Sequence, residues 1–110
     1  MQHDVREERG SLVVSFGGDV DLEHSPKARE VLLQCVARGR DVFVDLSAVN
    51  YIDSSGVASL VEAFQTSRQK GSRFALVAVN LAARRVLELA RLDKVFTIHE
   101  TLDEGLRGRT

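Results

Sequence analysis

The chain has 110 residues, of which 44% are hydrophobic and 28% charged, and 15 lysines and arginines against 16 acids give a net charge of −1. This near-neutral balance lacks the basic surface that nucleic-acid binding requires, so nucleic acid is excluded as an expected partner. No apolar stretch is long enough for a signal peptide or a membrane span, so a cytoplasmic protein without direct membrane contact is expected, folded as one domain over residues 1–110.

The first twenty residues predict an antiparallel hairpin. Residues 3–8 are polar apart from Val5, which is typical of an edge strand. Residues 12–16 form an apolar, β-branched run, and we expect Gly17-Gly18 to end that strand. Between the two runs, Arg9-Gly10-Ser11 has the chemistry of a tight turn.

A first helix is predicted after the hairpin. Ser25 followed by Pro26 indicates a helix start, with Ser25 as the capping residue and proline at the first helical position. Arg38-Gly39 suits its end, because glycine adopts a left-handed cap readily. The apolar residues between them follow the spacing of one helix face: Ala28, Val31, Leu32, Cys35 and Val36. The lone cysteine lies on this stripe and is expected to be a core residue in a reducing compartment.

The rest of the chain alternates strands with helices. Residues 42–46 predict an interior parallel strand, followed by a polar turn at 47–50 and, after the Asp-Ser-Ser-Gly segment, a helix that ends near Lys70. Residues 74–79 predict a second buried strand. The later expected elements are a helix capped by Asn80, a short strand over 95–98 and a helical turn over 102–106. This order predicts an α/β fold with a largely parallel central sheet, an N-terminal β-hairpin at one edge and helices packed against it.

The segment Asp53-Ser54-Ser55-Gly56 lies where a strand and its loop lead into a helix. Helix N-termini present free N–H groups that accommodate anions, so a phosphate on Ser54 would be partly satisfied there. Gly56 is expected to leave the backbone uncovered for a partner. The alternative is that Asp53 or Ser54 only caps the helix.

The string VFVDLSAVNYIDSSGVASLV around this segment resembles the central motif of STAS domains, found in anti-sigma factor antagonists and some transport-associated proteins. Upstream, residues 18–22 (GDVDL) are similar to the Gly-Glu-hydrophobic-Asp segment of the family. Downstream, residues 73–79 and the following helix and Leu-Asp-Lys-Val-Phe tail resemble its closing strand–helix–strand. The resemblance extends from about Leu12 to Leu106 and implies a STAS-like fold.

The resemblance also implies a mechanism. In anti-sigma factor antagonists, the first serine of the Asp-Ser-Ser-Gly segment, here Ser54, accepts phosphate from a partner that is both anti-sigma factor and serine kinase. The unphosphorylated form binds that kinase, phosphorylation dissociates the complex, and a phosphatase resets it. Ser55 is the alternative acceptor, and Asp21 either helps to shape the partner-binding surface or caps its own loop. The expected partner-binding residues are Asp21, Asp53, Ser54, Ser55 and Gly56.

Two other classes of function compete with this mechanism. A stand-alone STAS subunit that binds the ATPase of an ABC-type lipid transporter is the alternative, although such subunits tend to carry Ser or Thr followed by Ala at the two serine positions. An enzyme is not expected, because the chain has no Gly-x-Ser-x-Gly elbow and no dinucleotide or phosphate-loop motif. Its histidines, His3, His24 and His99, lack metal-ligand spacing, so neither a metal nor a cofactor is expected.

Overall fold

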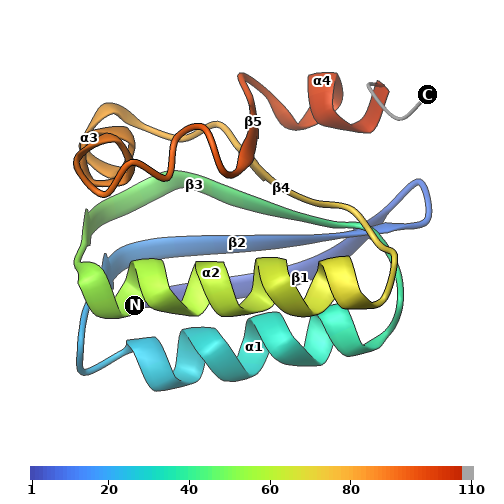
Figure 1. Cartoon of the computed structure of the whole chain (residues 1–110), viewed down its shortest axis with the longest axis horizontal. Helices are drawn as coiled ribbons and strands as arrows, with labels where there is room; N and C mark the ends of the chain where they lie inside the picture. Colours follow the sequence, from blue (N-terminus) through green and yellow to red (C-terminus); the bar gives the residue numbers. More distant parts are fainter. Residues whose placement is uncertain (108–110) are drawn as a thin grey trace.

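The computed structural model describes residues 1–107 and has a five-stranded sheet at its centre (Figure 1). The strand order is β1-β2-β3-β4-β5; β1 pairs antiparallel with β2, and every later pair is parallel. The strands are β1 (Gln2–Glu8), β2 (Ser11–Val20), β3 (Val42–Ile52), β4 (Phe74–Val77) and β5 (Thr97–His99). The expected α/β fold with an N-terminal hairpin is therefore confirmed.

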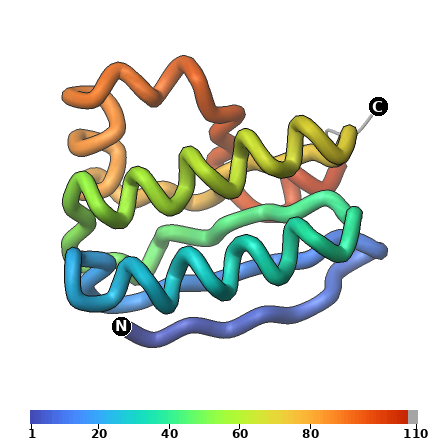
Figure 2. The backbone as a smooth tube through the Cα atoms, turned by 60° about the horizontal axis from the view of Figure 1, so that its bottom comes forward, coloured from blue at the N-terminus to red at the C-terminus, as the bar shows by residue number. Residues whose placement is uncertain are grey.

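Helices cover both faces of the sheet. They are α1 (Ser25–Ala37), α2 (Ser54–Gln69), α3 (Leu81–Leu89) and α4 (Leu102–Arg107). The helices α1 and α2 lie side by side on one face, and α4 lies on the other (Figures 1 and 2). Alternate residues of β3 serve the two faces: Val44 joins the larger core with α1 and α2, whereas Phe43 packs with Leu106 of α4. None of these helices is both long and apolar enough to span a bilayer.

The predicted hairpin turn is confirmed, but the strand that follows is longer than expected. Glu8 pairs with Ser11 across a two-residue turn, in which Arg9 and Gly10 have φ angles of 52° and 83°; two positive φ values are the signature of a type I′ hairpin. The strand β2 does not end at Gly17-Gly18, because both glycines still pair with β3. Register shifts on either side absorb the positive φ of Gly18, 79°.

The polar turn predicted at residues 47–50 is also wrong, since β3 continues without a break to Ile52. In this stretch every third side chain is buried, Leu46, Val49 and Ile52, and the residues between them are exposed. On one side the extension pairs with β2. On the other side β4 has ended, and the side chain of Asn80 donates instead to the carbonyls of Ser47 (3.3 Å) and Val49 (2.6 Å).

Three element boundaries differ from the expectation for local reasons. The N-cap of α1 is His24 and not Ser25, because the Asp21 carbonyl accepts hydrogen bonds from both of their N–H groups. The strand β4 stops at Val77, since Ala78 has a φ of 52°. The strand β5 starts at Thr97, because the N–H groups of residues 95 and 96 are held in a turn by the Leu92 carbonyl. Asn80 does cap α3, as predicted, accepting from the Ala83 N–H at 2.9 Å.

Candidate protein-binding site

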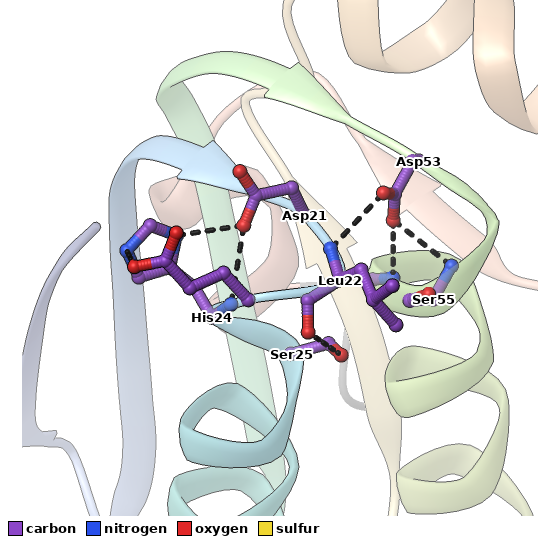
Figure 3. A network of polar contacts seen from close by, with 8 residues as sticks. Asp21, Leu22, His24, Ser25, Asp53 and Ser55 are labelled. Carbon is purple, nitrogen blue, oxygen red and sulfur yellow. Dashed lines mark hydrogen bonds and ion pairs between the residues drawn. The ribbon is translucent and has the colours of Figure 1, made fainter.

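The start of α2 lies at the carboxyl end of β3, with Asp53 between the two elements. Asp53 is the N-cap: its Oδ1 accepts hydrogen bonds from the N–H groups of Ser55 (2.9 Å) and Gly56 (3.1 Å) (Figure 3). Helix-capping by Asp53, one of the two readings of the sequence, is therefore present in the structure.

The same carboxylate also fixes a second loop. Its Oδ2 accepts from the backbone N–H of Leu22 at 3.1 Å, in the loop between β2 and α1. The backbone N–H of Asp53 donates to the Val20 carbonyl at 3.4 Å. One side chain thus holds two loops from distant parts of the sequence at the same end of the sheet, so the surface around Ser54 is pre-organised.

Gly56 is buried, which differs from the open backbone expected from the sequence. A Cβ at this position would lie 2.4 Å from the Val20 carbonyl oxygen and 2.8 Å from Cγ1 of Ile52. Real Cβ atoms do not approach other atoms so closely, and a backbone carbonyl in a sheet cannot move aside cheaply. The absence of a side chain lets α2 begin directly against the end of β2.

The two serines at the start of α2 face different neighbours. Ser54 is exposed and lies at the mouth of a groove of about 720 Å³ between α2 and α3. The groove is lined mainly by apolar side chains: Val57, Val61, Val86, Leu89 and Ala90. Ser55 is half-buried and lines the opposite side of α2, beside Arg29 of α1.

Three of the N–H groups that were expected to receive a phosphate are already occupied. The carboxylate of Asp53 accepts from the N–H groups of Ser55 and Gly56, and the N–H of Val57 donates to the Asp53 carbonyl. A phosphate on Ser54 would therefore add its charge beside an existing carboxylate and would not fill a vacant anion site. The charge of such a phosphate would therefore be less compensated within the chain than the sequence predicts.

Asp21 is engaged within its own loop. Its Oδ1 accepts from the backbone N–H of His24 at 3.1 Å and contacts Nδ1 of the same residue at 2.7 Å (Figure 3). Partial desolvation acts to raise the pKa of Asp21, but the hydrogen bonds from His24 outweigh it and hold the pKa below its ordinary value of 3.8. Asp21 therefore shapes the loop that carries Leu22, which agrees with the loop-capping reading.

The sequence reasoning missed three features of this surface. Leu22, next to Asp21, is 73% exposed, and Leu89 on the rim of the groove is 86% exposed. Both are apolar residues outside the predicted core stripes, which was the available signal. The third is His24, whose three-residue spacing from Asp21 fits a side-chain pair across a turn. Within residues 1–107, no group of three or more potential metal ligands is assembled.

We expect Asp53→Ala to lower the free energy of unfolding by about 2–3 kcal/mol, because three backbone N–H groups lose their acceptor. Asp53→Asn is the matched control: its amide oxygen can still cap α2, whereas its NH2 group cannot accept from Leu22. Urea denaturation should therefore place the asparagine variant between the wild type and Asp53→Ala. Equal stability of all three proteins would contradict the double role of Asp53.

Comparisons with known proteins place the chain in a family. A sequence model of the STAS domain matches residues 2–105. The anti-sigma-F factor antagonist RsfB of Mycobacterium tuberculosis is 35% identical over 107 residues, covering 94% of this chain and 85% of RsfB. The structure of an anti-sigma factor antagonist from Mycobacterium paratuberculosis is 30% identical, with a TM-score of 0.87 and coverage of 96% and 91%.

A more distant likeness shows the fold alone. The structure of the unphosphorylated anti-sigma factor antagonist SpoIIAA superimposes with a TM-score of 0.80 at 16% identity, covering 99% of each chain. SpoIIAA from Bacillus is also known in its phosphorylated form, which superimposes with a TM-score of 0.74, covering 96% of this chain and 97% of SpoIIAA.

Proposed function

The chain belongs to the STAS domain family, and from this premise we propose that it is a cytoplasmic anti-sigma factor antagonist. In this proposal it binds an anti-sigma factor with serine kinase activity while Ser54 is unphosphorylated. Phosphate on Ser54 dissociates the complex, and a phosphatase restores the binding form. The relative that is 35% identical carries this class of function in its name.

The observation that carries the proposal is the placement of Ser54. Its hydroxyl is exposed at the start of α2, at the mouth of an apolar groove, and the two loops around it are tied together by Asp53. An exposed apolar surface around a rigid polar centre suits a protein partner. The domain itself catalyses nothing in this mechanism, since a charge added at one position changes which partner binds.

The fold is compatible with such a modification. SpoIIAA, which shares the fold, is known both with and without phosphate. In the present chain, Ser54 is exposed, and the side chain that caps α2 is that of Asp53 and not that of Ser54. Phosphorylation there would alter the surface charge without removing any of the contacts that hold the two loops.

The experiment begins with affinity purification of the tagged protein from the organism that carries the gene. We expect a serine kinase with anti-sigma factor activity to co-purify and to label the wild type with radioactive phosphate. Ser54→Ala should lose this labelling entirely, because the acceptor hydroxyl is gone. Ser55→Ala is the matched control, and it should be labelled like the wild type, since that side chain faces α1.

Two results would contradict the proposal. Full labelling of Ser54→Ala would place the acceptor elsewhere. Recovery of an ABC-type ATPase and its permease, without any kinase, would favour the transporter-subunit alternative, in which the same surface serves for docking. Circular dichroism of both alanine variants checks that loss of labelling is not loss of folding.

A further inference from the structure

The strand β1 leaves one edge of the sheet open. It spans Gln2–Glu8, and each residue from Gln2 to Glu7 is exposed. Figure 2 shows β1 as the outermost part of the molecule on its side, and within residues 1–107 β2 is its only neighbour in the sheet. An open strand edge offers unpaired N–H and C=O groups to another strand, and proteins commonly protect such edges with charges.

The hairpin turn decides which groups of β1 face the open edge. Glu8 pairs with Ser11 across a two-residue turn, so its backbone groups point toward β2. Strand residues direct their backbone groups alternately to the two sides. The groups of His3, Val5 and Glu7 therefore point to the open edge, and an antiparallel partner must align its own outward residues with these three.

The charges along β1 are arranged so that two antiparallel copies of the strand bring opposite charges together. When a second β1 runs antiparallel with Val5 opposite Val5, Asp4 of each chain lies opposite Arg6 of the other, and His3 lies opposite Glu7. We propose that two copies of this chain associate through β1 in this register and form one continuous ten-stranded sheet about a two-fold axis. The interface is isologous, so each favourable charge pair occurs twice.

The geometry singles out this register. A shift by one residue would set outward backbone groups against inward ones and break the hydrogen-bond ladder. A shift by two residues in one direction places Asp4 opposite Asp4, and in the other direction Arg6 opposite Arg6. Like charges directly opposite each other destabilise a strand pair. Only the alignment on Val5 satisfies both the backbone and the charges.

Two of the side chains concerned already make contacts within their own chain. Arg6 lies 3.4 Å from the carboxylate of Glu8 and 3.4 Å from the hydroxyl of Ser15, and Glu7 lies 2.8 Å from Arg40. These groups are partly exposed, and such surface ion pairs contribute only about 0–1 kcal/mol, so the pairs across the two-fold axis can replace them.

The pair that fixes the register is weakly held in the single chain. Asp4 is 67% exposed and Arg6 42% exposed, and they are held to each other only loosely, at 3.9 Å. In the paired strands they become neighbours across a non-hydrogen-bonded position, where side chains approach most closely. Val5, which is 39% exposed in the single chain, becomes covered by its own copy at the two-fold axis.

Sedimentation equilibrium of the full chain over a range of concentrations tests this dimer. We expect a reversible monomer–dimer equilibrium with a dissociation constant on the order of 10–100 μM, as for a small transient interface. Asp4→Arg and Arg6→Asp should each weaken the dimer by on the order of thirtyfold, because two attractive pairs become repulsive. Glu100→Arg, a similar charge change beyond β5 at the opposite edge of the sheet, should leave it unchanged.

Mixing the two single variants gives the decisive result. A chain with Asp4→Arg carries cations at both position 4 and position 6, and a chain with Arg6→Asp carries anions at both positions. An equimolar mixture should therefore form heterodimers, although each variant alone is monomeric, and the double variant Asp4→Arg/Arg6→Asp should regain self-association. A wild type that stays monomeric up to about 1 mM, or a mixture that fails to associate, would overturn the proposal; circular dichroism confirms that each variant is folded.

Discussion

Gly56→Ala is expected to lower the free energy of unfolding by about 3 kcal/mol, a large effect for the addition of one methyl group. The added Cβ would lie 2.4 Å from the Val20 carbonyl oxygen, so α2 has to shift away from the end of β2. That shift pulls on the Asp53 cap, whose hydrogen bonds to Ser55 and Gly56 depend on the position of the first turn.

Whether Gly56→Ala lowers or raises the free energy of unfolding shows whether packing or helix propensity dominates at this position. In an open helix, replacing glycine by alanine stabilises by about 1 kcal/mol, because alanine loses less backbone entropy. At Gly56 the steric clash with a backbone atom outweighs that gain. A stabilised Gly56→Ala variant in urea denaturation would show that the start of α2 moves freely, and it would contradict the rigid junction described above.

Gly105 in α4 provides the matched comparison. A Cβ there would also be close to its neighbours, 3.1 Å from both Cδ2 of His99 and Cε1 of Phe43. These atoms belong to side chains, and α4 is a short helix near the end of the described chain, so small movements can relieve the contact. Gly105→Ala should therefore cost about 1 kcal/mol or less, well below the loss at Gly56.

The elements with a clear repeating pattern were predictable from the sequence. The apolar stripe from Ala28 to Val36 lies on the buried face of α1, and Cys35 is a core residue whose pKa is raised by burial. The two-residue turn at Arg9-Gly10 and the Asn80 cap followed from local chemistry alone. In each case the residues that decide the structure are close together in the sequence.

The errors fall where distant segments decide the local structure. Residues 47–50 are polar, yet they form a strand because β2 pairs with one side and Asn80 satisfies carbonyls on the other. Gly56 and its two serine neighbours suggest an open loop, but the carbonyl of Val20, more than thirty residues earlier in the sequence, lies against Gly56. The hydrogen bond from the Leu22 N–H to the Asp53 carboxylate also joins residues that are far apart in the sequence. Such contacts depend on the register of the whole sheet, which local patterns do not contain.

The charge on Ser54, and not its size, is expected to control partner binding. Phosphorylation would add a charge of roughly −1.5 to −2 beside Asp53, whose carboxylate already occupies two of the N–H groups at the start of α2. The new charge is therefore left for the partner surface to accommodate. Burying an uncompensated charge in an interface should weaken binding to the co-purified anti-sigma factor by on the order of a thousandfold.

A pair of variants separates charge from bulk. Ser54→Glu introduces one negative charge, and we expect it to weaken binding by about tenfold to a hundredfold, while Ser54→Gln, of nearly the same shape, should bind within a few-fold of the wild type. Isothermal titration calorimetry with the anti-sigma factor measures both affinities. Equal losses of affinity for the two variants would show that the size of the side chain, and not its charge, weakens binding. That result would contradict the electrostatic switch. A loss confined to Ser54→Glu places the control of binding in the cost of burying the added charge against the partner, because the carboxylate of Asp53 already occupies two N–H groups of α2 that could have compensated it.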